Sequence, residues 1–198
     1  MSSVHDKWDR RYRSEPPAPG APCRVLRDFS HLLPRHGRAL DLAAGRGANA
    51  CLLASHGLET EAWDLSAVAM EQLRAHARHS GLPLMTQVRD VINAPPAATS
   101  FDIIVVSRFL HRPLCPSLAA ALRPGGLLFY QTFTHDRVDP TIGPTNPDYL
   151  LGANELLCLF PGLQTVAYRE EGSLGDPAQG LRNEAYLVAQ QPACQVSA

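Results

Sequence analysis

The sequence lacks a long apolar run. None of the apolar stretches in its 198 residues approaches the roughly 18 residues that a membrane-spanning helix requires. The chain starts with the charged stretch MSSVHDKWDRRYRSE, whereas a secretory signal peptide has an apolar core. We therefore expect a cytoplasmic protein without a membrane partner.

The sequence also lacks an excess of basic charge. It contains 18 lysine and arginine residues against 19 acidic residues, and the basic residues form no run. Proteins that bind a nucleic-acid backbone usually neutralise it with clustered Lys and Arg side chains. We expect no nucleic-acid partner, and we predict no oligomeric state.

Motifs for metal binding and for nucleophilic catalysis are missing as well. The cysteines are Cys23, Cys51, Cys115, Cys158 and Cys194. They are scattered and form no CxxC pair, which is typical of a chain in a reducing compartment. The sequence has no histidine and acid set at metal-ligand spacing and no GxSxG motif, so we expect neither a metal site nor acyl-transfer chemistry.

Length and composition predict one domain. A chain of 198 residues with 45% apolar content can bury a substantial core. The Pro/Gly-rich stretch EPPAPGAP follows a polar start and predicts a turn. We therefore predict an N-terminal segment over residues 1–21 and a single domain over residues 22–198.

Strand-like and helix-like patterns alternate along most of the chain. Short apolar runs typical of strands cover residues 38–43, 60–65, 84–88, 101–106 and 127–133. Helical patterns cover residues 22–33, 47–56, 66–80 and 113–122. This alternation predicts an α/β fold with a doubly wound, mostly parallel sheet.

The last part of the chain departs from this alternation. A helical pattern at residues 154–160 precedes two strand-like runs, at 163–168 and 184–189, with no helical pattern between them. Two adjacent strands without a crossover predict an antiparallel hairpin. The predicted sheet therefore has seven strands, of which the last pair is antiparallel.

The most informative motif is the stretch ALDLAAGRGANA. Asp41 ends the first predicted strand, and Gly45 and Gly47 occupy the turn into the next helix, where glycine allows close approach of a ligand. Dinucleotide-binding enzymes also use a glycine-rich turn, but the spacing here is not GxGxxG. A carboxylate at position 41 would repel phosphate and attract an ammonium group, which favours S-adenosylmethionine.

Two further acids follow the second and third predicted strands. Asp64, in EAWDLS, is suited to accept both ribose hydroxyls of a nucleotide, and its alternative role is to stabilise the start of the following helix. Asp90, in VRDVIN, is suited to bind the adenine amino group with Val91 against the ring. Its alternative role is that of an ordinary loop carboxylate.

These motifs together resemble those of class I S-adenosylmethionine-dependent methyltransferases. That group carries DxGxGxG, an acid after the second strand, an acid after the third, and an LxPGG turn before the fifth. Here the four motifs read DLAAGRG, AWDLS, RDV and LRPGG, in the same order. The sequence departs from the pattern at Ala43, where the group usually has its first glycine.

A narrower resemblance covers residues 5 to about 135. DKWDRRY and GRGANACLLASHGLETEAWD look like the tellurite-resistance (TehB-like) and thiopurine methyltransferase group. In that group an aromatic residue of the N-terminal segment closes over the cofactor, which implies this role for Trp8 and for residues 1–21. An arginine after the fourth strand lies close by in that group, and it matches Arg108 here.

The resemblance implies S-adenosylmethionine as the cofactor. The cofactor site is predicted to comprise Trp8, Asp41, Ala43, Gly45, Gly47, Asn49, Asp64, Leu65, Asp90, Val91 and Ser107. Ligands of such sheets lie beyond the carboxyl ends of the strands. The loops SRFLHR and QTFTHDR therefore predict the acceptor side, with Arg108, His111 and His135 as candidate catalytic residues.

The predicted reaction moves a methyl group to a heteroatom of a small molecule. Sulfur, selenium or tellurium acceptors need little beyond alignment and exclusion of water, whereas oxygen or nitrogen acceptors need a base within reach. The Pro/Gly-rich residues 138–152 predict a lid that sets specificity. For each histidine the alternative is an ordinary surface residue.

Two alternatives to this function stay open from the sequence. The first is a non-catalytic S-adenosylmethionine-binding module, supported by Ala43 in place of glycine. The second is a nicotinamide-dependent oxidoreductase, which Asp41 and the predicted antiparallel hairpin disfavour. Binding of S-adenosylmethionine or of NAD distinguishes the second from the methyltransferase.

Overall fold

The computed structural model describes residues 4–193, which form a seven-stranded sheet in the order β3-β2-β1-β4-β5-β7-β6. The strands are β1 (Arg38–Leu42), β2 (Glu59–Asp64), β3 (Leu84–Val88), β4 (Phe101–Ser107), β5 (Leu122–Phe133), β6 (Gln164–Glu170) and β7 (Glu184–Gln190). The first five strands pair in parallel, while β7 pairs antiparallel with both β5 and β6. The predicted fold class and the antiparallel C-terminal pair are confirmed.

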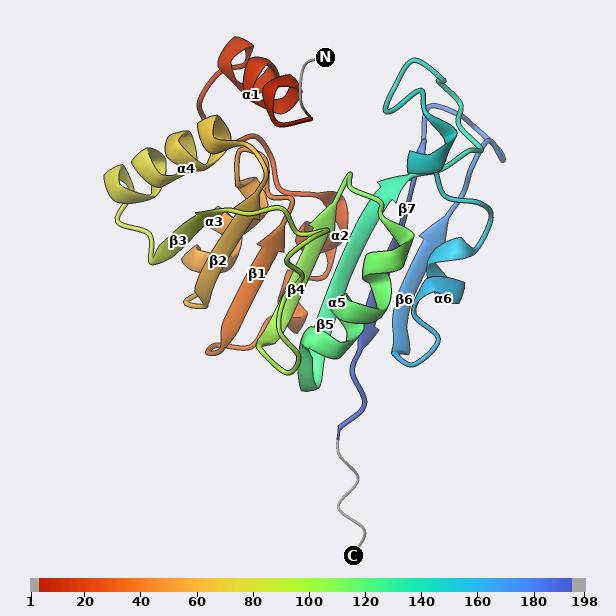
Figure 1. Cartoon of the computed structure of the whole chain (residues 1–198). Coiled ribbons are helices and arrows are strands. Elements are labelled where there is room, and N and C mark those ends of the chain that lie inside the picture. Colours follow the sequence, from red (N-terminus) through yellow and green to blue (C-terminus); the bar gives the residue numbers. More distant parts are fainter. Residues whose placement is uncertain (1–3, 194–198) are drawn as a thin grey trace, which may run out of the picture.

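Helices cover both faces of the sheet (Figure 1). The helices on one face are α2 (Arg24–Asp28), α3 (Ala48–Ser55) and α4 (Ala67–His79), and those on the other are α5 (Cys115–Ala121) and α6 (Glu155–Leu159). The central strand β4, FDIIVVS, is almost continuously apolar because it is covered on both sides. This arrangement leaves the carboxyl ends of the parallel strands along one edge of the molecule.

Two predicted helices are divided in the structure. The pattern at residues 22–33 becomes α2 and the short 3₁₀ helix η1 (Ser30–Leu32). They meet at Phe29, which has a φ of −115° and packs edge-on against Tyr186 with 5.9 Å between ring centroids. The pattern at 113–122 becomes η2 (Arg112–Leu114) and α5, and β5 begins at Leu122, five residues before the predicted start. Aromatic packing thus overrides the simple helical period at Phe29.

The connection from β3 to β4 forms a braced loop. The Arg89 guanidinium lies over the Trp63 ring, 3.8 Å from its centroid, and donates to the backbone oxygens of Ala94 and Pro95. Trp63 is buried although it lies near the edge of the sheet. The loop therefore covers the part of β2 where a helix would otherwise pack.

The polar start of the chain folds into a helix that the sequence patterns did not predict. This helix, α1 (Val4–Ser14), lies above the carboxyl ends of the first strands and packs against α4 (Figure 1). None of its eleven described residues is buried. The helix therefore rests on the surface of the domain, and its partly buried Tyr12 packs against a core cluster that contains Met70 and Leu73.

Candidate functional site

The turn after β1, residues 43–47, has an unusual backbone. Ala43, Gly45 and Gly47 adopt positive φ angles of 55°, 54° and 76°. A Cβ on Gly47 would lie 2.3 Å from Leu73 Cδ2, so helix α4 packs directly on this residue. A side chain at Gly45 or Gly47 would therefore clash with Tyr12 or Leu73 in addition to the cost of the left-handed backbone, and we call residues 43–47 the glycine turn.

Asp64, at the end of β2, holds the glycine turn. Its Oδ2 accepts from the Gly45 N–H at 2.8 Å, and its Oδ1 accepts from the Ser66 N–H at 2.8 Å. Burial raises the pKa of this carboxyl, while the backbone bonds from Ser66 and Gly45 lower it. The contact of Asp64 with Ser66 corresponds to the alternative role considered for Asp64, which is to stabilise the start of α4.

Asp41, at the end of β1, is fully buried beside the start of α3. Its carboxylate accepts from the Ala50 N–H at 3.0 Å and from Asn49 Nδ2 at 3.3 Å. Asn49 also donates to Ser107 Oγ at 3.1 Å and accepts from the Cys23 N–H at 2.9 Å. Burial raises the pKa of Asp41 from 3.8 to about 7, and the hydrogen bonds from Asn49 and Ala50, which lower the pKa, offset only part of this effect.

Helix α1 covers the glycine turn through Tyr12. The Tyr12 hydroxyl lies only 2.8 Å from the place that a Cβ on Gly45 would occupy. Burial and the charge of Asp64 hold the pKa of Tyr12 well above its ordinary value, so it is a neutral phenol. Trp8 is half-buried and stacks on Tyr12 with 6.0 Å between ring centroids, so it supports the covering ring.

The two predicted site residues in the loop after β3, Asp90 and Val91, have different surroundings. Val91 is buried in the core cluster that contains Trp63. Asp90 accepts from the Ile92 N–H at 3.0 Å and from Asn93 Nδ2 at 2.7 Å, which lowers its pKa. In this structure Asp90 therefore braces its own turn, as expected for the alternative of a loop carboxylate.

The other half of the carboxyl edge is covered by two loops, residues 134–151 and 171–183, which we call the paired loops. Thr134 N–H donates to the Asn183 backbone oxygen at 3.0 Å, and Asp139 N–H donates to Asn183 Oδ1 at 3.1 Å. Ser173 N–H donates to Asp136 Oδ2 at 3.1 Å. These bonds join the two loops to each other.

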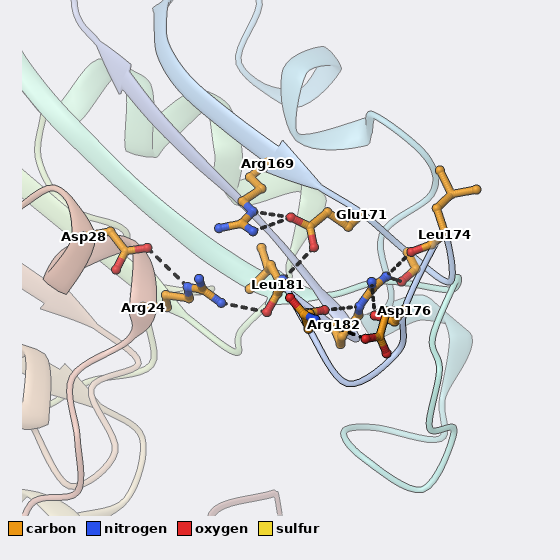
Figure 2. A network of polar contacts seen from close by, with 11 residues as sticks. Arg24, Asp28, Arg169, Glu171, Leu174, Asp176, Leu181 and Arg182 are labelled. Atoms are coloured by element: carbon orange, nitrogen blue, oxygen red, sulfur yellow. Dashed lines mark hydrogen bonds and ion pairs between the residues drawn. The ribbon is translucent and has the colours of Figure 1, made fainter.

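Arginine side chains brace the paired loops. Arg112 contacts both carboxylate oxygens of Glu155, at 2.5 and 2.9 Å, and donates to the backbone oxygens of Asp148 and Leu150. Within the second loop, Arg182 donates to the backbone oxygens of Leu174 and Asp176, as Figure 2 shows. The predicted lid at residues 138–152 is thus fastened at its carboxyl end by a residue of the β4–α5 connection.

The same network ties the second loop to the sheet and to helix α2 (Figure 2). Arg24 of α2 donates to the Gly180 backbone oxygen at 2.7 Å and pairs with Asp28 at 3.2 Å. Glu171, at the end of β6, accepts from the Leu181 N–H at 2.8 Å and pairs with Arg169. The paired loops are therefore held on the domain at several points.

Arg108 lies between the two halves of the edge. It has a left-handed φ of 53°, its Nε donates to Glu184 Oε1 at 2.7 Å, and its guanidinium lies 5.6 Å from the Phe133 ring centroid. Glu184 is buried and also accepts from Gln131 Nε2. The Arg108 side chain is 67% exposed, so its position is fixed by Glu184 while much of the guanidinium faces solvent.

The two candidate histidines lie in the loops that follow β4 and β5, at the same edge of the sheet as Arg108. His111 is half-buried in the loop after β4, and His135 is exposed after β5. Among residues 4–193, no three His, Cys, Asp or Glu side chains form a group that could hold a metal ion. None of the described helices is long and apolar enough to span a membrane.

Comparison with known proteins agrees with this geometry. Residues 39–126 match the family model described as a methyltransferase domain. The ubiquinone biosynthesis O-methyltransferase of Methylocella silvestris is 26% identical over 200 residues, which cover 91% of this chain and 75% of the relative. That of Coxiella burnetii is 26% identical over 138 residues, which cover 67% of this chain and 59% of the relative.

Solved structures share the fold over nearly the whole chain. TehB from Haemophilus influenzae superposes with a TM-score of 0.70 at 19% identity, covering 94% of this chain and 66% of that chain. A protein from a study of disulfide-to-thioacetal conversion in echinomycin biosynthesis has a TM-score of 0.73 at 22% identity, covering 98% and 95%. At these identities the likeness concerns the fold.

Residues 39–126 therefore form a methyltransferase domain, and methyl transfer is the activity that the names of the relatives give. The predictions of the enzyme class and of its cofactor are confirmed, and the resemblance to TehB is confirmed at the level of the fold. The relatives are methyltransferases, which leaves the oxidoreductase alternative without support.

The residues at the carboxyl edge of the methyltransferase domain fit this cofactor. Asp41 is a buried carboxylate whose hydrogen-bond donors, the Asn49 amide and the Ala50 N–H, are both neutral. The positively charged ammonium group of the cofactor would supply the missing counter-charge. The two oxygens of Asp64 accept from the Gly45 and Ser66 N–H groups, and a carboxylate oxygen can accept more than one hydrogen bond. Asp41 is completely buried, so it would not contact a bound ammonium group at the surface. It would instead stabilise the ammonium group electrostatically over a short distance or through Asn49.

Three residues near this site were not predicted from the sequence of the methyltransferase domain. Tyr12, Asp9 and Glu184 were not singled out, although Tyr12 follows Trp8 at helical spacing in DKWDRRY. Asp9 contacts Ser66, and Glu184 contacts Arg108, across long stretches of sequence. Only the helical spacing of the two aromatic residues could have indicated one of them beforehand.

Proposed function

We propose that this domain transfers the methyl group of S-adenosylmethionine to a heteroatom of a small molecule bound between α1 and the paired loops. The observation that carries the proposal is the convergence of Asp41, Asp64 and the glycine turn at one end of the parallel strands. We further propose that residues 1–21 cover the cofactor site and that the protein works in the cytoplasm.

Roles for the cofactor-side residues follow from their contacts. Asp64 holds Gly45 and offers acceptors to the ribose hydroxyls, while Leu65 and Val91 flank the base. Asp41 acts on the ammonium group through Asn49, which also contacts Ser107. The Tyr12 ring excludes water from above the glycine turn.

Bound S-adenosylmethionine supplies an electrophilic methyl group, so the protein must align the acceptor and exclude water. The curated relatives are named as O-methyltransferases, which favours an oxygen acceptor over sulfur, selenium or tellurium. An oxygen acceptor needs a base, and His111 and His135 are the titratable candidates in the loops after β4 and β5. Arg108 would attract the acceptor in its anionic form.

The non-catalytic alternative rests on Ala43, and the backbone geometry weakens that support. Ala43 adopts the left-handed φ of 55° that a glycine would have in this turn. Its methyl group packs against the core cluster of Val91. The replacement therefore leaves the path of the turn intact, which favours a working cofactor site.

Calorimetry with S-adenosylmethionine, S-adenosylhomocysteine and NAD tests the cofactor assignment. We expect micromolar dissociation constants for the first two and no binding of NAD. An acceptor screen then follows with phenols, thiols, selenite and tellurite, with S-adenosylhomocysteine release as the readout. Lack of binding of both sulfur ligands contradicts the proposal, and binding without turnover on any acceptor class favours the non-catalytic module.

A further inference from the structure

The start of helix α4 is capped by two segments of the chain. Ser66 Oγ accepts from the Ala69 N–H at 3.2 Å, as an ordinary N-cap does. The Ser66 hydroxyl in turn donates to Asp9 Oδ1 at 2.5 Å, and the same Asp9 oxygen accepts from the Val68 N–H at 3.3 Å. A carboxylate of α1 thus completes the cap of a helix that begins more than fifty residues later.

The cap is continuous with the cofactor side of the site. The Ser66 N–H donates to Asp64 Oδ1, and Asp64 Oδ2 accepts from the Gly45 N–H, both at 2.8 Å. A line of hydrogen bonds therefore runs from Asp9 through Ser66 and Asp64 to the glycine turn. Movement of α1 away from α4 would break this line at Asp9.

The other contacts of α1 with the domain include the packing of Tyr12 against a core cluster and two polar contacts. Gln72 Nε2 donates to the Tyr12 backbone oxygen at 3.3 Å, and His5 Nδ1 contacts the Leu65 backbone oxygen at 3.1 Å. None of the eleven described residues of α1 is fully buried, and Tyr12 is the residue of α1 that packs against a core cluster, so apolar burial holds the helix at one side chain. Asp9 of α1 places a negative charge at the amino end of α4, where the helix dipole is positive.

We propose that Asp9 is a positioning residue that latches α1 onto α4, so that Tyr12 covers the glycine turn and completes the cofactor site. The inference rests on the proposed function, because the cofactor is what the latched helix encloses. Asp9 itself lies on the α4 side of the helix and acts through Ser66 and the position of Tyr12. Opening of this latch admits the cofactor, and closure retains it.

Three variants of the full chain test the latch. Asp9→Ala removes the acceptor, Asp9→Asn keeps an oxygen that can accept from Ser66 and Val68, and Lys7→Ala is the control on an exposed position of the same helix. The dissociation constant of S-adenosylhomocysteine is measured by calorimetry. Trypsin cleavage after Arg10, Arg11 and Arg13 of α1, sites that all three variants keep, is followed by mass spectrometry without ligand as a separate measure of docking.

We expect Asp9→Ala to raise the dissociation constant about tenfold, the loss typical of a hydrogen bond to a charged group, and to speed cleavage within α1. Asp9→Asn should restore affinity to within about threefold of the parent, and Lys7→Ala should match it. Unchanged affinity and cleavage in Asp9→Ala would overturn the latch. So would a fall of more than about 10 °C in its melting temperature, which would assign Asp9 to folding.

The two proposals fail in different ways. If the parent protein binds no S-adenosylhomocysteine, the proposed function fails, while the cleavage comparison without ligand still decides whether Asp9 holds α1. If the parent binds and Asp9→Ala binds equally well, the function stands and the latch is wrong. Rescue by Asp9→Asn separates a positioning role from a loss of general stability.

Discussion

The two halves of the carboxyl edge are covered in different ways. Over β1 and β2 the cover is α1, a helix without a buried described residue that is held by a few polar contacts. Over β5 and β7 the cover is the paired loops, whose backbone oxygens accept hydrogen bonds from Arg112 of the β4–α5 connection and from Arg182 of the second loop. One cover is suited to open, and the other is braced in place.

This difference matches what each half has to do under the proposed function. A cofactor enclosed above the glycine turn must enter and leave in every cycle, so its cover needs contacts that break at small cost. The acceptor half must hold a small molecule in line with the methyl group, and preorganised loops reduce the ordering cost of that alignment. Exchange of the cofactor and alignment of the acceptor are therefore assigned to different halves of the same edge of the sheet.

The largest effect on the cofactor half is expected for Asp64→Ala. The substitution leaves the buried N–H groups of Gly45 and Ser66 without their acceptor and removes a ribose acceptor. We expect a 10- to 100-fold weaker S-adenosylhomocysteine affinity and a loss of roughly 2–4 kcal/mol in unfolding free energy. Calorimetry and denaturant titration measure the two effects.

Asp28→Ala is the matched control for that prediction. Asp28 is an exposed carboxylate paired with Arg24 on α2, and exposed ion pairs contribute little to stability. We expect wild-type affinity and stability for this variant. A folded Asp64→Ala protein with unchanged affinity would remove the ribose assignment.

Arg112→Ala tests whether the acceptor half is independent of the cofactor half. It removes the bonds to the backbone of Asp148 and Leu150 and leaves Glu155 without its cation. We expect roughly 2–3 kcal/mol lower unfolding free energy, together with unchanged S-adenosylhomocysteine affinity. Arg112→Lys is the conservative comparison, since a single ammonium cannot reproduce the fork of contacts.

A different result for Arg112→Ala would break the comparison of the halves. Loss of cofactor affinity as large as that of Asp64→Ala would mean that the paired loops and the glycine turn act as one unit. Under the proposed function, the Michaelis constant for the acceptor is the quantity that should rise instead. Steady-state kinetics with saturating cofactor separates these outcomes.

Tyr12→Ala sharpens the description of the α1 cover. Tyr12 lies directly over Gly45, whereas Trp8 reaches the site by stacking on Tyr12. We expect about a tenfold loss of S-adenosylhomocysteine affinity for Tyr12→Ala and about a twofold loss for Trp8→Ala, because burial of an aromatic ring contributes on the order of 1–2 kcal/mol. Equal losses would restore Trp8 as the covering residue.

Asp41 predicts that cofactor affinity depends on pH. Its pKa in the free protein is raised to about 7, so the carboxylate becomes fully charged only above neutral pH. Because the cofactor's ammonium favours the charged form, S-adenosylhomocysteine affinity should rise about fivefold between pH 6 and pH 7.5. Asp41→Asn should flatten this part of the profile in calorimetry over the same range.

The sign for stability of the free protein is the opposite. The folded pKa of Asp41 lies above its ordinary value of 3.8, so the folded state binds this proton more tightly than the unfolded state does. The contribution of Asp41 to the unfolding free energy is therefore largest at low pH and falls as pH rises from about 4 to about 7. Saturating S-adenosylhomocysteine should reduce this fall, and chemical denaturation at several pH values tests it.

The sequence predicted the parallel sheet and the cofactor motifs because both have local signatures. Apolar runs such as FDIIVVS mark covered strands, and Asp41 and Asp64 stand directly at strand ends. The helix α1 has apolar residues only at Val4, Trp8 and Tyr12 among eight polar ones, and the sequence analysis did not predict a helix from these three positions. Its position depends on tertiary contacts such as that of Asp9 with Ser66.

The arginine–carboxylate contacts of the acceptor half could not be predicted from the sequence either. Arg108 and Glu184 are 76 positions apart, and Arg112 and Glu155 are 43 positions apart. An arginine that binds a distant carboxylate has the same local sequence signal as one that faces solvent. The left-handed φ of Arg108 has no local signal either, since that conformation is usual for glycine.

The smallest effect is expected for Ala43→Gly, which tests the glycine turn itself. A left-handed backbone costs an alanine about 1–2 kcal/mol relative to the ordinary helical region, but glycine gains more freedom in the unfolded chain. We expect a net gain of about 0.5–1 kcal/mol in unfolding free energy and no loss of S-adenosylhomocysteine affinity. A destabilised variant would mean that the Ala43 methyl, packed against the core cluster of Val91, contributes more than the backbone strain removes.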